Sequence, residues 1–260
     1  MTGVTVITGA SSGIGAALAH EAARAGRKPV LVSRSEEGLA KVADTIAAEG
    51  HGRPEVVPLD LTDRDAADRL ASELSKRGLS VFELVNNAGY GLVGSVTAHA
   101  RADEVGIVDL NVRALTDLTL RFLPEIIAAK GGVLNVASTA AFQPGPYAAI
   151  YYASKSYVLS FSEALAYELR RRVRVTALCP GPVPTNFQQR ANPGKDKLFS
   201  HLPGMSAEKC AAIGWRCFEK GQRVVIPGFL NKIGAFLAPR APRKAVLAVS
   251  AYVATKRRAK

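Results

Sequence analysis

The sequence predicts an α/β fold, in which a doubly wound parallel sheet of about seven strands carries helices on both faces. Short runs rich in β-branched residues alternate with helix-length segments along most of the chain. Such alternation produces right-handed strand–helix–strand crossovers and a parallel sheet. The length of 260 residues and the 48% hydrophobic content suit one large domain with a single core.

The expected elements follow this alternation in chain order. The strand candidates are short and apolar, and they lie at residues 4–8, 29–33, 55–59, 81–87, 132–138, 173–178 and 223–227. Helices are expected between them, notably over residues 13–26, 36–50, 151–169 and about 206–219.

The alternation weakens after Pro180. Residues 180–204 are rich in Pro, Gly and Asn and too long for a routine connection, so we expect a substrate loop or lid region over 180–219. Residues 228–260 contain two apolar pieces separated by PRAPRK, which predicts two short helices. We therefore expect one domain over residues 1–227, with a helical extension over 228–260 packed on it or flanking it.

The charge and the rarer residues limit the partners. The formal net charge is +12, with clusters at 170–174 and 255–260 that we interpret as a solvated helix end and a chain terminus. We expect no nucleic acid partner, and a membrane surface is the less favoured interpretation. The four histidines lie too far apart to predict a metal site. The N-terminus lacks the features of a signal peptide, and no apolar run approaches the ~20 residues of a membrane-spanning helix, so a cytoplasmic protein is expected.

The segment TGASSGIG, residues 8–15, links the first strand to the first helix. A glycine-rich link of this kind lets the backbone approach a pyrophosphate closely, while the free N–H groups of the helix start face the anion. Strand, loop and helix occur in the order that a dinucleotide site requires. A tight turn or a helix start that binds no phosphate is the alternative.

Four motifs in order resemble the short-chain dehydrogenase/reductase family. They are TGASSGIG, NNAG at 86–89, Tyr151-x-x-x-Lys155 lying 13 residues after Ser138, and PGPVPT at 180–185. The resemblance covers about residues 4–190 and implies a Rossmann-type sheet that binds NAD or NADP. It implies that the pyrophosphate contacts Gly9, Ser12, Gly13, Ile14 and Gly15. The adenine would contact Asp60, and the adenosine ribose would contact Asn87, Ala88 and Gly89. The nicotinamide carboxamide would contact Val183 and Thr185, with Pro180 and Gly181 beside them.

The end of the second strand favours NADP over NAD. An NAD site usually carries an acidic residue about 20 positions after the glycines, whereas this strand ends in Ser33-Arg34. A guanidinium can form a forked contact with a 2′-phosphate. A surface arginine is the alternative, and Ser12 stands where relatives that prefer NADP often carry a second basic residue.

Three tyrosines surround Lys155 in the segment 148–157. Tyr151 lies four residues before Lys155 and so shares its helix face, Tyr152 is not excluded by geometry, and Tyr157 points elsewhere. A phenol has an ordinary pKa near 10, and a nearby ammonium is expected to lower that pKa and bring proton exchange within reach. The resemblance assigns the acid/base role to Tyr151, and it assigns contact with the nicotinamide ribose to Lys155.

The remaining catalytic candidates are Ser138 and Asn111. Ser138 ends a strand, where a hydroxyl faces the cofactor crevice. The resemblance implies that Ser138 binds the substrate carbonyl oxygen and that Asn111 joins a water to the lysine in a proton relay.

We therefore expect an NADP-dependent oxidoreductase that interconverts a carbonyl compound and an alcohol by hydride transfer, and a homo-oligomer is expected. Phe142, Tyr147, Tyr152 and Phe187 among the expected pocket walls indicate a hydrophobic substrate. A nucleotide-binding regulator without catalysis and a peripheral membrane protein are the alternatives.

Overall fold

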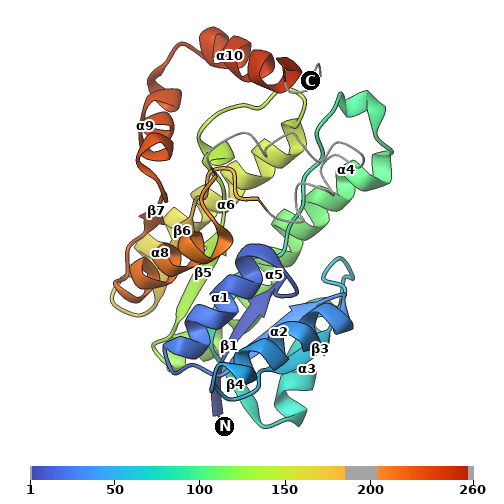
Figure 1. Cartoon of the computed structure of the whole chain (residues 1–260), viewed down its shortest axis with the longest axis vertical. Coiled ribbons are helices and arrows are strands. Elements are labelled where there is room, and N and C mark those ends of the chain that lie inside the picture. The colour runs from blue at the N-terminus through green and yellow to red at the C-terminus, as the bar shows by residue number, and fades with distance from the viewer. Residues whose placement is uncertain (1, 185–203, 257–260) are drawn as a thin grey trace.

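The computed structural model describes residues 2–184 and 204–256 (Figure 1). Its centre is a seven-stranded parallel sheet with the strand order β3-β2-β1-β4-β5-β6-β7. The strands are β1 (Thr2–Thr8), β2 (Pro29–Ser33), β3 (Glu55–Pro58), β4 (Leu79–Asn86), β5 (Gly132–Val136), β6 (Arg174–Leu178) and β7 (Val224–Val225). The order reverses between β1 and β4, and a ligand crevice is expected at such a switch point. The predicted doubly wound fold is confirmed.

Helices cover both faces of the sheet. One face carries α1 (Gly13–Arg24), α2 (Glu36–Ala48) and α8 (Ala207–Glu219), and the other carries α3 (Ala66–Lys76), α5 (Leu115–Ala128) and α6 (Ala149–Glu168). Side chains alternate along each strand, so Ile7 packs with Leu18 on the first face, while Val6 packs with Phe122 on the second. Both faces are therefore apolar, and the strands are almost continuously buried.

A continuous helical segment precedes the second half of the sheet. It begins as α4 (Arg101–Val108), passes through the π-helical turn η2 (Asp109–Ala114) and continues as α5. Short 3₁₀ turns lie at η1 (Val96–Ala98) and at η3 (Thr139–Phe142), directly after β5. The segment and η3 both lie beside the carboxyl ends of the central strands.

A buried ion cluster joins strands at the opposite end of the sheet. Glu83 of β4 is fully buried and accepts hydrogen bonds from Thr5 at 2.9 Å, Arg27 at 3.2 Å and Arg174 at 2.8 Å. The cluster 170–174 was expected to be a solvated helix end, with residue 174 also inside the expected strand 173–178. Arg174 does begin β6, but its guanidinium pairs with this carboxylate instead of being fully solvated, because it reaches across β5 to the buried acid of β4.

The C-terminal region adds α9 (Phe229–Leu237), the turn η4 (Ala238–Arg240) and α10 (Arg243–Lys256). Figure 1 shows α9 and α10, in red, beyond the carboxyl ends of the strands. Asn231 of α9 packs on Gly181 and donates to the Pro227 carbonyl at 2.7 Å, which fixes α9 beside the loop after β6. Within the described residues, no helix is both long and apolar enough to traverse a bilayer.

Candidate active site

One large cleft opens along the carboxyl ends of the central strands. Its volume is about 1840 Å³, larger than the roughly 300–1,000 Å³ of a site for a single drug-sized ligand. The cleft runs from the glycine loop past β4 and β5 to α9 and α10. Its size suits a dinucleotide and a second small molecule together.

The glycine loop forms one end of this cleft. Gly9 and Gly13 have φ angles of 65° and 59°, a conformation that side chains disfavour. Gly13 begins α1, and Ser12 at its N-cap makes no side-chain capping bond. The N–H groups of the first turn therefore open toward the cleft, where the positive helix end suits a pyrophosphate. The residues present thus fit the phosphates of a dinucleotide.

Two predicted residues support the loop from behind. Gly15 is buried and is not among the residues that line the cleft. It packs closely behind the loop, because a side chain at this position would collide with the Gly9 carbonyl and Asn87. The Asn87 amide donates to the carbonyls of Thr8 at 2.9 Å and Gly9 at 3.2 Å. Asn87 therefore holds the loop in shape as well as lining the cleft.

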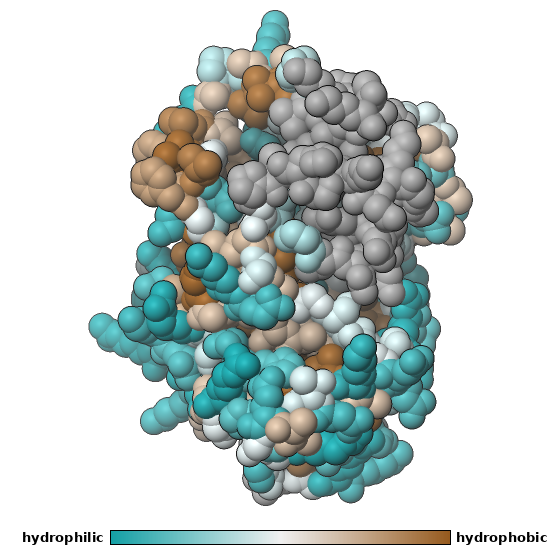
Figure 2. Space-filling model, in the orientation of Figure 1, coloured by the Kyte–Doolittle hydropathy of each residue, from teal (hydrophilic) through white to brown (hydrophobic). Residues whose placement is uncertain are grey.

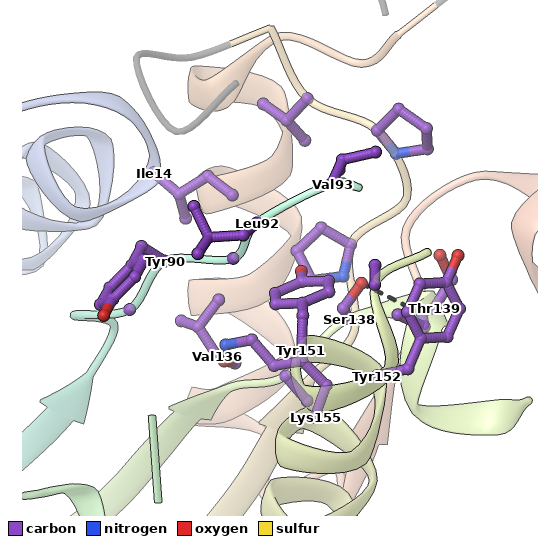
Figure 3. A pocket seen from close by; sticks show the side chains of 18 of the residues that line it. Ile14, Tyr90, Leu92, Val93, Val136, Ser138, Thr139, Tyr151, Tyr152 and Lys155 are labelled. Carbon is purple, nitrogen blue, oxygen red and sulfur yellow. Dashed lines mark hydrogen bonds between the residues drawn. The ribbon is translucent and has the colours of Figure 1, made fainter. Parts of the chain in front are cut away.

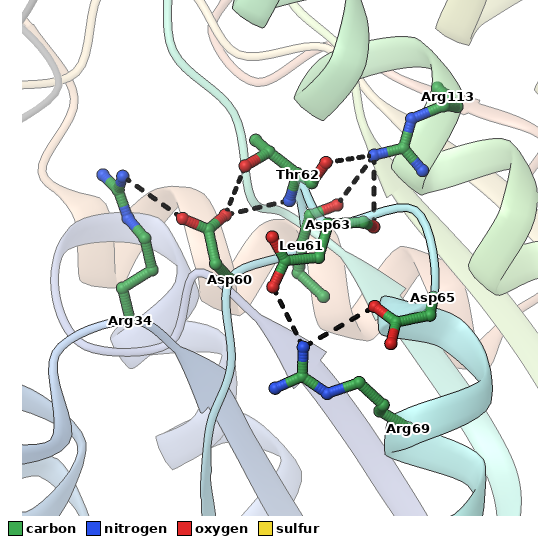
Figure 4. Close-up of polar contacts among 8 residues, drawn as sticks. All are labelled: Arg34, Asp60, Leu61, Thr62, Asp63, Asp65, Arg69 and Arg113. Atoms are coloured by element: carbon green, nitrogen blue, oxygen red, sulfur yellow. Dashed lines mark hydrogen bonds and ion pairs between the residues drawn. The ribbon is translucent and has the colours of Figure 1, made fainter.

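Arg34 and Asp60 lie together at the ends of β2 and β3 (Figure 4). The guanidinium of Arg34 is 3.7 Å from the Asp60 carboxylate, and its side chain is 63% exposed. Thr62 donates to the same carboxylate through its N–H at 2.9 Å and its hydroxyl at 2.7 Å. Partial burial opposes ionisation of Asp60, but the Thr62 bonds and the Arg34 charge outweigh it and lower the pKa of Asp60. The acid is thus ionised and orients the exposed arginine.

The other predicted cofactor residues line the middle of the cleft. The described members of this set are Ile14, Ala88, Gly89, Pro180, Gly181 and Val183. Thr185 and the pocket residue Phe187 lie outside the described residues. These six residues come from α1 and from the loops after β4 and β6, so distant segments converge on one wall.

Tyr151 stands at the centre of the cleft, in the first turn of α6 (Figure 3). Gly91 lies against its ring, since a Cβ on Gly91 would come within 2.6 Å of that ring. Tyr152 meets it edge-on, with ring centroids 6.0 Å apart. Burial raises the pKa of Tyr151 to about 12, although a hydrogen bond with the Ser138 side chain works in the opposite direction. Tyr151 is thus a neutral phenol at neutral pH, held in a close-fitting slot.

Lys155 lies one turn further along α6 and is buried. Its ammonium donates to the Val136 carbonyl at 2.8 Å and lies 5.9 Å from the centre of the Tyr151 ring. Burial lowers the pKa of Lys155 to about 8. The expectation that this ammonium lowers the pKa of Tyr151 differs from the structure, because burial of the phenol dominates and raises that pKa.

Ser138 follows β5 and is the N-cap of η3. Its hydroxyl oxygen accepts the N–H of Ala140 at 3.1 Å, and the same side chain hydrogen-bonds with Tyr151, so two contacts fix it. Figure 3 shows Ser138 beside Tyr151 at the same wall of the cleft. The two hydroxyl groups can therefore approach one substrate oxygen together.

Asn111 is buried behind this wall, in the π-helical turn η2. Its amide nitrogen donates to the Tyr90 carbonyl at 2.9 Å and to Ser154 at 3.0 Å, and its oxygen accepts the Tyr90 N–H at 3.0 Å. A Cβ on Gly89 would lie 2.8 Å from the Asn111 oxygen and 3.6 Å from the Lys155 ammonium. Asn111 and Lys155 thus flank one small space, although both amide hydrogens of Asn111 are already used.

Several residues of the site have no signal in the sequence. Gly91 and Tyr90 occupy positions that only the folded chain relates to Tyr151 and Asn111, and the Val136 contact uses a backbone carbonyl.

Tyr147, an expected wall residue, has a φ of 65°, a rare conformation for a bulky side chain that clusters at functional sites. Its carbonyl accepts the Gly94 N–H at 2.8 Å, which holds this loop in place.

Comparisons with known proteins show the family to which the chain belongs. The short chain dehydrogenase family model matches residues 3–196. A sulfoacetaldehyde reductase of Chromohalobacter salexigens is 35% identical over 219 residues, which cover 81% of this chain and 86% of the relative. A short-chain dehydrogenase/reductase of Burkholderia phymatum in complex with NAD superposes with a TM-score of 0.81 at 27% identity, covering 91% of this chain and 92% of that one. A short-chain dehydrogenase of Sphingobium yanoikuyae in complex with NADPH gives 0.80 at 27%, covering 92% and 94%. The chain is therefore a member of the short-chain dehydrogenase/reductase family, a family of NAD(P)-dependent oxidoreductases.

Proposed function

We propose that this protein is an NADP-dependent oxidoreductase that interconverts a ketone or aldehyde and an alcohol. The observation that carries the proposal is the convergence of Tyr151, Ser138 and Lys155 at one wall of a cleft that also contains the glycine loop. A hydroxyl pair beside a buried ammonium has the groups needed to bind a carbonyl oxygen and to exchange a proton with it. A regulator without catalysis has no chemical need for that set.

A nicotinamide dinucleotide held by the glycine loop and by Lys155 would supply or accept the hydride. In the reductive direction Ser138 donates a hydrogen bond to the substrate oxygen, and Tyr151 transfers its proton to that oxygen as negative charge develops there. The raised pKa of Tyr151, about 12, keeps the phenol protonated and available as the acid. Lys155, with a pKa of about 8, remains mostly cationic at pH 7 and stabilises the phenolate that is left. Asn111 orders the chain segment beside Lys155. A water at this place would return the proton to Tyr151.

The preference for NADP is proposed from the adenosine end. Arg34 is exposed and is oriented by the ionised Asp60, and no acid directly follows it at the end of β2. An acid placed there would bind a ribose 2′-hydroxyl, whereas a guanidinium suits a 2′-phosphate. The relatives do not decide the matter, since solved neighbours carry NAD in one case and NADPH in another.

A hydrophobic substrate is proposed from the wall around Tyr151. Within the described lining, the cationic side chains are Arg34 and Lys155, and Arg34 lies at the adenosine end. A sulfonate, as in the name of the bacterial reductase, would call for a further cation near Tyr151. Tyr147, Tyr152 and apolar side chains of α9 and α10 line that region instead.

The test is a panel of ketones, aldehydes and alcohols assayed with NADPH and NADH in parallel. Tyr151→Phe should lower turnover by at least about a hundredfold, in line with the loss of a general acid, while NADPH binding stays within a few-fold. Tyr157→Phe is the matched control, because Tyr157 pairs with Thr116 on the outer side of α6 and should retain activity. Full activity of Tyr151→Phe would disprove the assignment of the acid, and inactivity on the whole panel would favour the regulator.

Three further expectations belong to this proposal. We assign residues 1–227 to the catalytic domain, with 180–219 as its substrate region and 228–260 as an extension. The protein is expected to form a homo-oligomer and to reside in the cytoplasm. Size measurement by light scattering and fractionation of cells would test the last two.

A further inference from the structure

Helix α9 presents its large apolar side chains to the outside of the molecule. The exposed residues on it recur at helical spacing and form one stripe, with exposed fractions of 75% for Phe229, 78% for Leu230, 40% for Ile233, 56% for Phe236 and 55% for Leu237. The small residues Gly234, Ala235 and Ala238 lie on the side of α9 that lines the cleft. Figure 2 shows the resulting hydrophobic patch over α9. A surface helix normally turns its large apolar side chains toward the protein interior, so this distribution is reversed in α9.

A second set of exposed apolar side chains lies on the last helix. On α10, Leu247, Val249 and Tyr252 are exposed by 42%, 63% and 57%. We call these three residues, together with the five of the α9 stripe, the C-terminal apolar surface. Large exposed apolar side chains that gather in one region mark an interaction site in a folded protein.

The charge of the same segment identifies the partner. Residues 228–260 contain eight Lys and Arg and no Asp or Glu, so they hold eight of the twelve net positive charges of the chain. Lys232 in the first turn of α9 is exposed, as are Arg240, Arg243 and Lys244 around the turn between α9 and α10. The Arg240 guanidinium lies 3.8 Å from the centre of the Phe236 ring, so a cation and an exposed ring stand together. Apolar side chains flanked by cations match the boundary between acyl chains and anionic headgroups.

The position of this surface links it to the cleft. Leu230, Leu237 and Val249 belong to the C-terminal apolar surface and also line the cleft that contains Tyr151. The rim of the cleft is therefore part of the exposed apolar face.

We propose that the C-terminal apolar surface docks on an anionic membrane, with α9 and α10 lying in the headgroup region and the rim of the cleft facing the lipid. This docking does not depend on the proposed chemistry. A second copy of the chain is the competing occupant. In a symmetric dimer formed through this face, the same patch of both copies meets, so the exposed cations Arg240, Arg243 and Lys244 would come close to their own copies, and the described residues 228–256 contain no Asp or Glu to offset them. An anionic bilayer instead supplies the opposite charge.

The experiment is sedimentation of the full chain with vesicles of phosphatidylcholine alone or with about 30 mol% phosphatidylserine. We expect binding to the anionic vesicles, at least tenfold weaker binding to the neutral ones, and weakening as salt rises, since exposed charges are screened. The double change Phe229→Ser and Leu230→Ser should weaken binding to the anionic vesicles by more than about tenfold. Arg243→Gln with Lys244→Gln should weaken it by about thirtyfold.

Matched controls lie on the rest of the surface. Leu120→Ser on α5, where the side chain is 57% exposed, and Lys41→Gln on α2 should leave vesicle binding unchanged. Absence of binding to anionic vesicles, or equal binding to neutral ones, would overturn the proposal. So would a double serine variant that changes the protein from dimer to monomer in light scattering while its vesicle binding is intact, because the surface would then be a contact between copies.

Discussion

Replacement of Lys155 by Met should stabilise the fold while it removes activity. Burial lowers the pKa of Lys155 from 10.5 to about 8, so folding disfavours its ammonium form. One pKa unit corresponds to about 1.4 kcal/mol, which gives a cost of about 3 kcal/mol at pH 7. Met has a similar length and no charge, so it removes this cost. Its loss of the 2.8 Å bond to the Val136 carbonyl works against it by about 1 kcal/mol.

The pH dependence of the unfolding free energy separates the cost of the buried charge from packing and hydrogen-bond effects. Between about pH 8 and 10.5, the unfolded chain holds a proton on Lys155 that the folded chain has released, so the wild type gains stability as pH rises. The Met variant lacks this gain. The difference in unfolding free energy between the two proteins should therefore change by about 2–3 kcal/mol from pH 7 to pH 10. Packing and hydrogen-bond contributions do not change over this range.

The assay is urea denaturation at several pH values, followed by the fluorescence of Trp215, which is the single tryptophan of the chain and is buried. Lys41→Met, on the exposed surface of α2, is the control and should keep a constant difference from the wild type. If the curves for wild type and Lys155→Met ran parallel from pH 7 to pH 10, the buried ammonium would not carry the assigned cost.

Three other substitutions test separate parts of the structure. Gly91→Ala places a methyl group 2.6 Å from the Tyr151 ring, so turnover should fall at least tenfold with little change in NADPH affinity by fluorescence titration; unchanged turnover would mean that the slot does not position the phenol. Arg34→Gln should raise the KM for NADPH by about tenfold, the value of one charged hydrogen bond, and leave that for NADH unchanged; equal effects would remove the basis for NADP preference. Glu83→Ala leaves two arginines without their buried partner and should cost about 3–5 kcal/mol in urea unfolding, whereas Asp44→Ala, in an exposed pair, should cost less than about 1 kcal/mol.

The fold could be predicted because its signals are local. Each buried strand is an apolar run of four to eight residues, and the parallel order follows from the helices between the runs. Boundaries were less predictable: the last strand was expected over 223–227, but β7 comprises Val224 and Val225. Pairing with β6 ends there, and no sequence pattern marks the end of a neighbour.

The site was predictable only in part. Tyr151 and Lys155 are placed on one helix face by their spacing, and Ser138 reaches them because parallel strands end at one edge. The pKa values were not predictable, since they depend on burial by Gly91 and by the end of β5, which are distant in sequence from Tyr151 and Lys155. Arg174 shows the same limit, because its charge is matched by Glu83, 91 positions away.

The wide turn η2 separates two tasks within one continuous helix. A π-helical turn contains one residue more than an α-helical turn, so α4 and α5 have different rotational phases. The phase of α5 directs Phe122 into the sheet, while Asn111 inside the turn faces Tyr90 and Ser154. Removing one residue from this turn would tend to restore a single phase, and either Asn111 or the sheet-facing side of α5 would rotate out of place. A deletion or insertion at this point, even one that preserves every side chain named above, would therefore prevent Asn111 from lying at the site while α5 packs on the sheet.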